Sequence, residues 1–358
     1  MIHFYKLKVK EVRRETPDCV SIAFEIPEEL KENFLYSHGQ YLTLRTYING
    51  EEVRRSYSVC SSPLENELRV AVKKVEEGVF SRFANEQLKK GDIIEAMPPI
   101  GKFFTALDEA HKKSYVAFAA GSGITPILSI IKTTLLTEPN SQFTLVYGNR
   151  SRQTIIFKEE IEALKNKFIN RFSVIHILSR EKMDADLNFG RIDKEKCHLL
   201  FEKVINANTI DEFFLCGPEE MIISIKDCLD ELGIEGKRIH FELFTSHGLQ
   251  KTATATKKVY EPGEVKSKIT IRLDGSSFDF DLAFEGESIL DAALKKGADL
   301  PFACKGGVCC TCRAKLVEGE VEMDINYGLE PEEVEAGFIL TCQSHPRTEK
   351  VVVDFDVK

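Results

Sequence analysis

Cysteine spacing near the C-terminus constrains this chain more than any other feature. Four cysteines stand in the segment 304–312, and a further one, Cys342, follows later. Cys304, Cys309 and Cys312 together with Cys342 have the spacing C-x4-C-x2-C with a distant fourth cysteine. A disulfide scaffold is disfavoured because such scaffolds belong to small secreted domains, whereas this chain has 358 residues and no signal-peptide core at its start. We therefore expect these thiols to hold a metal centre.

The spacing matches that of the four thiolates around a plant-type [2Fe–2S] cluster. Zinc also accepts four thiolates and is the alternative, but zinc sites usually pair two short knuckles, and only Cys309 to Cys312 forms one here. Cys310 makes five candidates for four positions. Using it in place of Cys309 would give the spacing x5 and x1, so we predict that Cys310 is not a ligand. A one-electron iron centre would mean that the protein moves electrons.

Composition and charge exclude several classes of protein. The length predicts two to three domains, and 43% hydrophobic with 29% charged residues is ordinary for a globular protein. No apolar run approaches the ~20 residues that span a bilayer, so we expect a cytoplasmic protein with no membrane partner. The net charge is −9, of which residues 268–358 contribute −8. This acidity argues against nucleic acid as a partner and reflects either a solvated surface or steering toward a basic partner.

The C-terminal part, residues 268–358, reads as a small α+β domain. Its pattern predicts a strand, a turn, a short helix ended by Gly297, the cysteine loop and a closing strand, at residues 269–273, 274–275, 288–294, 304–312 and 351–355. This order resembles the β-grasp of the plant-type ferredoxin domain over its whole length. The resemblance implies that Cys304, Cys309, Cys312 and Cys342 ligate the cluster.

Residues 1–108 have the short alternating strands and Gly, Asn and Pro turns that predict a small antiparallel β-barrel. Inside this region stands Arg55-Ser56-Tyr57-Ser58, and Gly78-Val79-Phe80-Ser81 follows downstream. With these segments the chain resembles the ferredoxin–NADP reductase superfamily, whose flavin-binding barrel carries an R-x-Y-S motif. The resemblance implies that a flavin binds here, FAD in preference to FMN because the second segment would hold a pyrophosphate.

The flavin residues have chemistry that suits these roles. Arginine is a planar, permanently charged partner for a flavin phosphate, and tyrosine offers a ring face and a hydroxyl. The resemblance places Ser58 at the edge of the flavin ring where hydride arrives. The cofactor-binding residues that it implies are Arg55, Tyr57, Ser58, Val72, Lys73, Gly78, Val79 and Ser81.

Residues 109–245 change to alternating strands and helices, which predicts a doubly wound α/β domain with a parallel sheet. The expected strands are 115–120, 143–147, 172–178 and 212–216, with helices opening at 126 and spanning 157–168. Gly121-Ser122-Gly123-Ile124-Thr125-Pro126 lies between the first strand and the first helix. A glycine turn that opens a helix can hold a pyrophosphate. The segment matches the G-x-G-x-T-P motif of the same superfamily.

The resemblance implies further nucleotide residues. It places Cys216-Gly217-Pro218 at the nicotinamide, with Cys216 near the hydride-bearing carbon, and an acid and an aromatic, Glu242 and Phe244, near the flavin ring. The expected catalytic residues are therefore Ser58, Cys216, Glu242 and Phe244. The expected nucleotide-binding residues are Gly121, Gly123, Thr125, Pro126, Arg150, Ser179, Arg180, Cys216, Gly217 and Pro218.

Nucleotide preference depends on charge at two strand ends. A site for NAD usually carries an acid for the ribose 2′-hydroxyl, and the segment after the second strand, which holds Arg150, has none. Ser179 and Arg180 resemble the pair that binds the 2′-phosphate in relatives that use NADP, and a bidentate arginine suits that phosphate. We therefore predict NADPH as the donor, with NADH as the alternative.

Between the last two domains, residues 246–267 have little apolar periodicity and are expected to form a linker. The order of barrel, nucleotide domain, linker and ferredoxin resembles the reductase components of bacterial multicomponent oxygenases. It implies electron flow from NADPH through FAD and [2Fe–2S] to a separate oxygenase. The alternatives are reductases of other acceptors, such as a steroid-ring hydroxylase or a hybrid-cluster protein, and a stand-alone diaphorase or redox sensor. A zinc-stabilised binding module is a further alternative.

Overall fold

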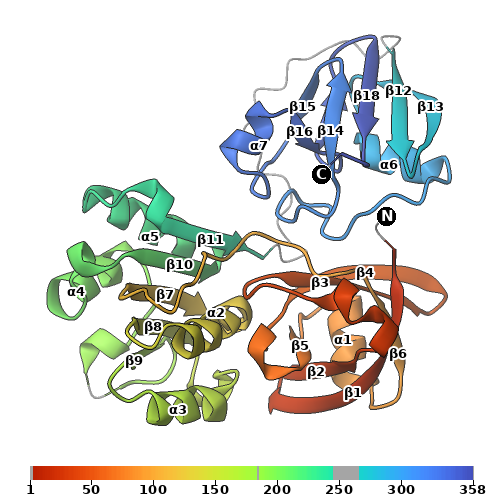
Figure 1. The fold of residues 1–358 in the computed structure, drawn as a ribbon. Coiled ribbons are helices and arrows are strands. Elements are labelled where there is room, and N and C mark those ends of the chain that lie inside the picture. The colour runs from red at the N-terminus through yellow and green to blue at the C-terminus, as the bar shows by residue number, and fades with distance from the viewer. Residues whose placement is uncertain (1–2, 184, 245–265, 358) are drawn as a thin grey trace. The chain divides into compact units, whose positions relative to one another are not determined.

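The computed structural model describes residues 3–183, 185–244 and 266–357. Contacts divide the chain into two compact units, one made of residues 4–53 and 57–244 and the other centred on 266–357. The first unit contains an antiparallel sheet and a parallel sheet, and the second has a mixed sheet of its own (Figure 1). The predicted linker falls mostly outside the described residues, and its last two positions already belong to the first strand of the second unit.

The antiparallel sheet has the strand order β4-β3-β6-β1-β2-β5. An isolated bridge between Val59 and Val70 joins the end of β4 to β5, which closes the sheet into the predicted barrel. Its interior is filled by alternate side chains of the strands, such as Leu7 and Val9 of β1. The elements are β1 Tyr5–Thr16, β2 Cys19–Glu25, β3 Tyr41–Ile48, β4 Glu51–Ser58, β5 Leu68–Lys73, α1 Val79–Glu86 and β6 Ile93–Ala96.

The parallel sheet has the order β11-β10-β7-β8-β9. Tyr115 and Ala117 of β7 enter one core, and Val116 and Phe118 enter the other, so both faces of the sheet are buried as a doubly wound fold requires. The elements are β7 Ser114–Ala120, α2 Ile124–Thr137, β8 Gln142–Asn149, α3 Lys158–Lys167, β9 Phe172–Leu178, α4 Lys194–Lys203, β10 Glu212–Gly217, α5 Glu219–Glu231 and β11 Ile239–Leu243.

The strand order reverses between β7 and β10, because the chain moves outward through β8 and β9 and then returns to the other side of β7. Ligands of open α/β sheets bind at the carboxyl ends of strands beside such a reversal. The Gly121–Gly123 turn follows β7, and Cys216 and Gly217 end β10. The topology thus brings the two predicted nucleotide segments to one place.

The second unit has a five-stranded sheet in the order β13-β12-β18-β14-β16, with β12 and β18 parallel. The hairpin predicted at Asp274-Gly275 is confirmed, and both residues have positive φ, as a tight two-residue turn requires. The elements are β12 Lys266–Leu273, β13 Ser276–Ala283, α6 Ile289–Lys295, β14 Arg313–Glu318, β15 Val321–Met323, α7 Pro331–Glu335, β16 Phe338–Leu340, β17 Ser344–Pro346 and β18 Lys350–Asp354.

The acidic residues of this unit are partly neutralised within it. Ion pairs join Lys350 to Glu318, Arg347 to Glu322 and Arg313 to Glu333. The first two pairs are exposed and add little stability, whereas Glu333 is buried. Part of the negative charge is thus balanced by pairing within the unit.

Candidate functional site

Three of the four predicted catalytic residues lie together where the barrel meets the nucleotide sheet. Ser58 ends β4, and its Oγ donates a hydrogen bond of 2.9 Å to Oε2 of Glu242 on β11. Glu242 is the register partner of Cys216 across the parallel pair β10 and β11. Phe244, the fourth residue, follows β11 and is 38% exposed. The fold thus converges residues that are 184 positions apart in sequence.

Burial controls the protonation of this group. Burial raises the pKa of the Cys216 thiol well above its ordinary value, and the nearby carboxylate of Glu242 adds to the effect. Burial also raises the pKa of Glu242 to about 7, against the opposing hydrogen bond from Ser58. The thiol therefore stays protonated at neutral pH, whereas the carboxyl can hold or release a proton there.

Replacing Glu242 by glutamine should change how stability depends on pH. The pKa of the folded carboxyl is raised, so its contribution to stability is full below the unfolded pKa near 4.5 and is lost as pH rises through about 7. We expect Glu242→Gln to stabilise the cofactor-free protein by about 1–3 kcal/mol at pH 8 and to change it little at pH 4.5. Calorimetric melting of both proteins at the two pH values tests this. An equal shift at both values would contradict the titration.

The Gly121–Gly123 turn has the shape that a pyrophosphate site needs. A Cβ atom on Gly123 would lie 2.0 Å from the carbonyl oxygen of Cys216, so only glycine fits between the turn and β10. Gly121 has φ +53°, and its carbonyl accepts a 3.0 Å hydrogen bond from the hydroxyl of Tyr147 on β8. The predicted residues Gly121, Gly123 and Gly217 therefore pack as one backbone surface.

Two helices offer N-terminal ends to phosphate groups. The N-caps of α1 and α2 are Gly78 and Gly123; neither makes a side-chain hydrogen bond, and neither helix has an acidic residue in its first turn. The first N–H groups of a helix have no partner inside the helix, and the helix dipole favours an anion there. These ends fit the pyrophosphates of a flavin and of a nicotinamide nucleotide. Thr125 and Pro126 lie buried in the first turn of α2.

The predicted flavin segment after β5 forms a turn that leads into α1. Val79 begins α1, and the Ser81 hydroxyl donates to the carbonyl of Gly78 and accepts from the N–H of Val75, at 3.1 Å each. A Cβ on Gly78 would lie 2.3 Å from Ser81 Oγ. Ser81 thus shapes the turn, and the N–H groups at the helix start are left to face a ligand.

The other predicted flavin residues come from β4 and β5. The Tyr57 ring centroid lies 5.3 Å from that of Phe80 in α1. The Arg55 guanidinium donates a hydrogen bond of 2.6 Å to the carbonyl oxygen of Arg54. Val72 is fully buried in the barrel. The Lys73 amine lies 3.6 Å from the Cβ position of Gly121, so the end of β5 meets the nucleotide turn.

The residues predicted to select the nucleotide gather at the ends of β8 and β9. The N–H of Ser179 bonds the carbonyl of Asn149, and the N–H of Arg180 bonds that of Arg150, both at 2.9 Å. Arg150 and Arg180 are exposed. Two arginine side chains therefore start from adjacent strand ends, and arginine forms strong, often bidentate hydrogen bonds with phosphate.

The four predicted cluster ligands converge in the second unit. Cys304 contacts Cys309 at 3.1 Å between sulfurs and also contacts Cys342, which contacts Cys312. The backbone N–H of Gly306 lies 3.3 Å from the sulfur of Cys304. Thiolates are the form that binds metal. This set of converging sulfurs fits a thiolate-bound centre.

Cys310 points elsewhere, because its sulfur lies 2.6 Å from the carbonyl oxygen of Gly328. Within the described ranges 3–183, 185–244 and 266–357, no group of three or more His, Cys, Asp or Glu side chains is placed around a single metal ion.

Several residues that shape this site were absent from the sequence prediction. Tyr147 supports the nucleotide turn through a side chain on the neighbouring strand, and no motif marks it. Lys132 and Glu65 connect the barrel to α2. Only Glu65 carried a signal, because Ser62-x-x-Glu65 has the spacing of a capping box, which the structure contains.

Comparisons with known proteins agree with this geometry. Three family models match in order: an oxidoreductase FAD-binding domain at residues 6–105, an oxidoreductase NAD-binding domain at 118–227 and a 2Fe-2S iron-sulfur cluster binding domain at 271–347. A subunit of 1,2-phenylacetyl-CoA epoxidase from Escherichia coli K12 is 46% identical over 358 residues, covering 100% of this chain and 99% of the relative. This chain belongs to the ferredoxin–NADP reductase superfamily with a C-terminal [2Fe–2S] domain. It is an NAD(P)H-dependent flavin iron–sulfur oxidoreductase with FAD-binding and [2Fe–2S]-binding domains.

Two further proteins similar to this chain carry the names of other oxygenase systems. The ferredoxin reductase component of 3-ketosteroid-9-alpha-monooxygenase from Rhodococcus rhodochrous is 33% identical, covering 98% of this chain and 96% of the relative. The structure of phthalate dioxygenase reductase, described as modular for electron transfer from pyridine nucleotides to [2Fe-2S], has a TM-score of 0.60 at 22% identity and covers 98% of both chains. This structural similarity confirms the fold predicted for the chain. None of the described helices is long and apolar enough to cross a membrane.

Proposed function

We propose that this chain is the reductase component of a phenylacetyl-CoA epoxidase in phenylacetate degradation, and that NADPH is its electron donor. The observation that carries the first part is the 46% identity to an epoxidase component along the whole chain, against 33% for the ketosteroid reductase component. When bound, FAD accepts a hydride and releases electrons singly, and the [2Fe–2S] cluster carries them one at a time. The protein binds the cofactors, sets the distances between them and provides groups that can exchange a proton with the flavin.

The flavin is proposed to lie across β4 and β5, held by Arg55, Tyr57 and Ser58. The backbone N–H groups at the start of α1, next to Gly78 and Val79, would hold its pyrophosphate. The Ser58 hydroxyl, hydrogen-bonded to Glu242, would hold a proton at the flavin edge, since the pKa of Glu242 near 7 lets it exchange one. Cys216, buried and protonated, would line the nicotinamide position without acting as a nucleophile.

Coupling to an oxygenase tests the assignment. The purified reductase should support epoxidation of phenylacetyl-CoA when mixed with the oxygenase subunits of the epoxidase, in proportion to NADPH consumed. A 3-ketosteroid 9α-hydroxylase oxygenase serves as the matched control and should receive few electrons. Better coupling to the steroid enzyme would favour the second reductase class, and NADPH oxidation without coupling to either would indicate a diaphorase.

The preference for NADPH rests on Arg150, Ser179 and Arg180. Arg180→Ala should raise the KM for NADPH about 10–100-fold, because a charge-assisted pair is worth about 1.5–3 kcal/mol. The KM for NADH should stay nearly unchanged, since NADH lacks the 2′-phosphate. Steady-state ferricyanide reduction with both nucleotides measures this.

Arg152→Ala is the control for this variant, because Arg152 pairs with Glu181 close by. It should affect the two nucleotides equally and weakly. Equal losses with both nucleotides in Arg180→Ala would show that Arg180 does not select the donor, and a lower KM for NADH in the parent protein would assign that nucleotide instead.

A further inference from the structure

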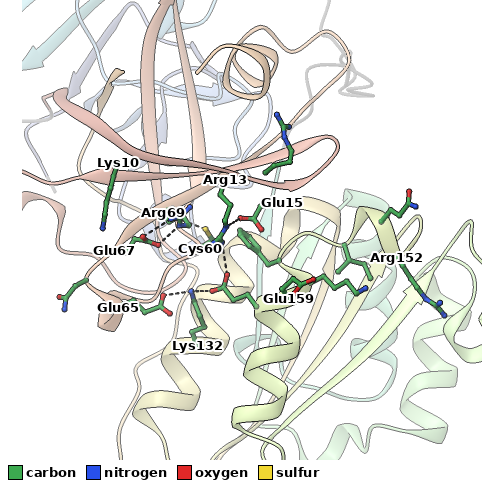
Figure 2. Close-up of a pocket in the computed structure, with 17 residues that line it drawn as sticks. Lys10, Arg13, Glu15, Cys60, Glu65, Glu67, Arg69, Lys132, Arg152 and Glu159 are labelled. Carbon is green, nitrogen blue, oxygen red and sulfur yellow. Dashed lines mark hydrogen bonds and ion pairs between the residues drawn. The ribbon is translucent and has the colours of Figure 1, made fainter. Parts of the chain in front are cut away.

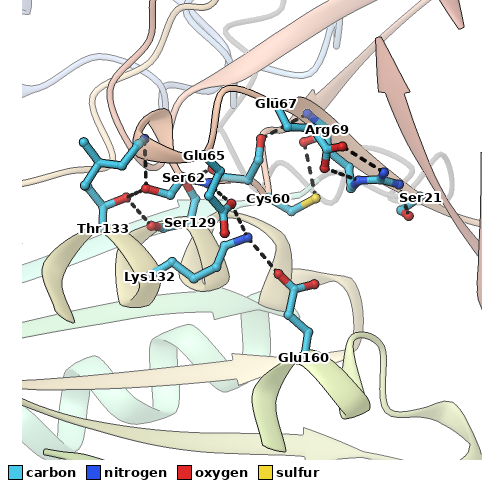
Figure 3. A network of polar contacts seen from close by, with 12 residues as sticks. Ser21, Cys60, Ser62, Glu65, Glu67, Arg69, Ser129, Lys132, Thr133 and Glu160 are labelled. Carbon is cyan, nitrogen blue, oxygen red and sulfur yellow. Dashed lines mark hydrogen bonds and ion pairs between the residues drawn. The ribbon is translucent and has the colours of Figure 1, made fainter. Parts of the chain in front are cut away.

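An ion cluster around one buried lysine connects the barrel to the nucleotide half of the first unit. The Lys132 amine on α2 lies 2.7 Å from Oε2 of Glu65, in the barrel turn Pro63–Glu65, and 2.8 Å from Oε1 of Glu160 on α3. Figure 3 shows Lys132 between the two carboxylates. Lys132 is 5% exposed, which is rare for a lysine unless it is paired. We call Glu65, Lys132 and Glu160 the interdomain lock.

Two buried hydrogen bonds lie beside the lock. Ser62 Oγ and Thr133 Oγ1 are 2.9 Å apart, and Ser129 Oγ donates a 2.6 Å hydrogen bond to the carbonyl of Ser61. These four residues are no more than 5% exposed. Directional bonds in a low-dielectric interior tolerate little displacement. They therefore fix both the distance and the rotation of α2 against the barrel.

A cavity of about 820 Å³ lies next to the lock, between β1 and β5 on the barrel side and the start of α3 on the other. Figure 2 shows that charged side chains from both halves line it, including Arg13, Arg69 and Lys132. Close packing of apolar side chains holds protein parts rigid, and the cavity replaces such packing here. At this edge the lock therefore joins the two halves together with the Ser62–Thr133 and Ser129–Ser61 hydrogen bonds and the core that Cys60 shares with α2.

The lock connects the two segments that the reaction must bring together. Ser61 and Ser62 lie three and four residues after the end of β4 at Ser58, and Lys132 lies on α2, the helix that directly follows the Gly121–Gly123 turn. A helix transmits position along its length because its backbone bonds are internal. A shift of α2 against Ser61 would therefore move the nucleotide turn relative to Ser58.

We propose that Lys132 is a positioning residue for hydride transfer, acting through Glu65 and Glu160 to hold the nicotinamide half against the flavin strand. The inference rests on the proposed placement of flavin at Ser58 and nucleotide at Gly121–Gly123. The step concerned moves two electrons and one proton together from NADPH to the flavin and leaves NADP⁺, with a second proton taken up from solvent. Lys132 touches neither cofactor in this account.

Stopped-flow flavin reduction and calorimetry test the proposal on the full-length protein. Lys132→Met should lower the reduction rate at saturating NADPH about 10–100-fold, because a displacement of about 1 Å costs rate of that order. The KM for NADPH and the FAD content should change less than about twofold, since the residues that bind either group are intact. Glu65→Gln, which can keep its cap to Ser62 but loses its charge, should lower the rate less, and Lys132→Arg should restore most of it.

Calorimetry of the cofactor-free variants gives a readout independent of turnover. The first unit of the parent protein should melt in one cooperative transition, and Lys132→Met and Glu65→Gln should separate it into two. Lys113→Met is the matched control, because Lys113 pairs with Glu212 inside the nucleotide half, at 3.1 Å, and should change neither rate nor cooperativity. This control distinguishes the effect of removing any paired lysine from the effect of removing the lysine of the interdomain lock.

An unchanged reduction rate in both lock variants, a raised KM at constant rate, or a single transition in all proteins would overturn the proposal. Ferricyanide serves as the acceptor throughout, so the result does not depend on which oxygenase the protein serves. Ser58→Ala and Gly121→Ala report on the cofactor sites themselves. If these variants lose FAD or show a raised KM for NADPH while the lock variants behave like Lys113→Met, the positioning role of Lys132 is wrong and the proposed cofactor sites are supported.

Discussion

Replacing Cys304, Cys309, Cys312 or Cys342 by serine should each abolish the [2Fe–2S] cluster, and with it electron transfer to any one-electron acceptor that depends on the cluster. The four sulfurs converge in a chain of contacts, so removing one leaves a centre with too few thiolates. Iron and sulfide analysis with EPR of the reduced proteins measures the loss. NADPH-dependent reduction of ferricyanide should persist, because it needs only the flavin half.

Cys310→Ser is the matched control, since it removes a thiol of the same loop, whose sulfur lies 2.6 Å from the carbonyl oxygen of Gly328. It should retain iron, sulfide and the EPR signal. Cluster loss in Cys310→Ser together with retention in any of the other four would overturn the ligand assignment. A colourless parent protein that contains zinc would restore the zinc alternative.

A fragment that ends at residue 245 should keep the flavin and nucleotide chemistry and lose the delivery of single electrons. The three hydrophobic cores of the first unit draw no residue from 266–357, so we expect the fragment to fold. It should bind FAD and reduce ferricyanide with NADPH at a rate close to that of the full chain. Its activity with cytochrome c or an oxygenase should fall to background.

Steady-state assays of the fragment and the full protein with all three acceptors make this comparison. The full-length Cys304→Ser variant is the control, because it keeps the C-terminal unit but should lack the cluster. The fragment and the Cys304→Ser variant should behave alike toward each acceptor. Full support of an oxygenase by the fragment would place the ferredoxin unit outside the electron path.

Much of the fold could be predicted because the decisive signals are local. The Asp274-Gly275 hairpin follows from the positive φ that its turn requires. Five consecutive residues of β7, Tyr115–Ala119, are buried, and all five are apolar in the sequence, which predicts a strand covered on both faces. The glycine turn at Gly121–Gly123 announces a helix start, although α2 begins two residues before the expected Pro126.

Other predictions required the resemblance to a family as well as the residues. Ser58, Cys216 and Glu242 carry no shared local motif, and the structure alone shows that a 2.9 Å hydrogen bond and a strand register bring them together. Ser81 was predicted to bind the flavin as part of a segment that holds its pyrophosphate, and this stays a prediction. The structure adds that the Ser81 hydroxyl also bonds Gly78 and Val75 within the turn before α1.

The sequence by itself determined the class of chemistry, because the C-x4-C-x2-C spacing, the R-x-Y-S strand and the glycine turn are written in consecutive residues whose geometry is set by short-range backbone rules. Only the tertiary structure decided which groups share an environment. The pKa of Glu242 near 7 depends on burial by distant segments, and the pairing of Lys132 with Glu65 and Glu160 joins three separate elements. Desolvation and charge pairing act through space, so no local pattern in the chain could specify them.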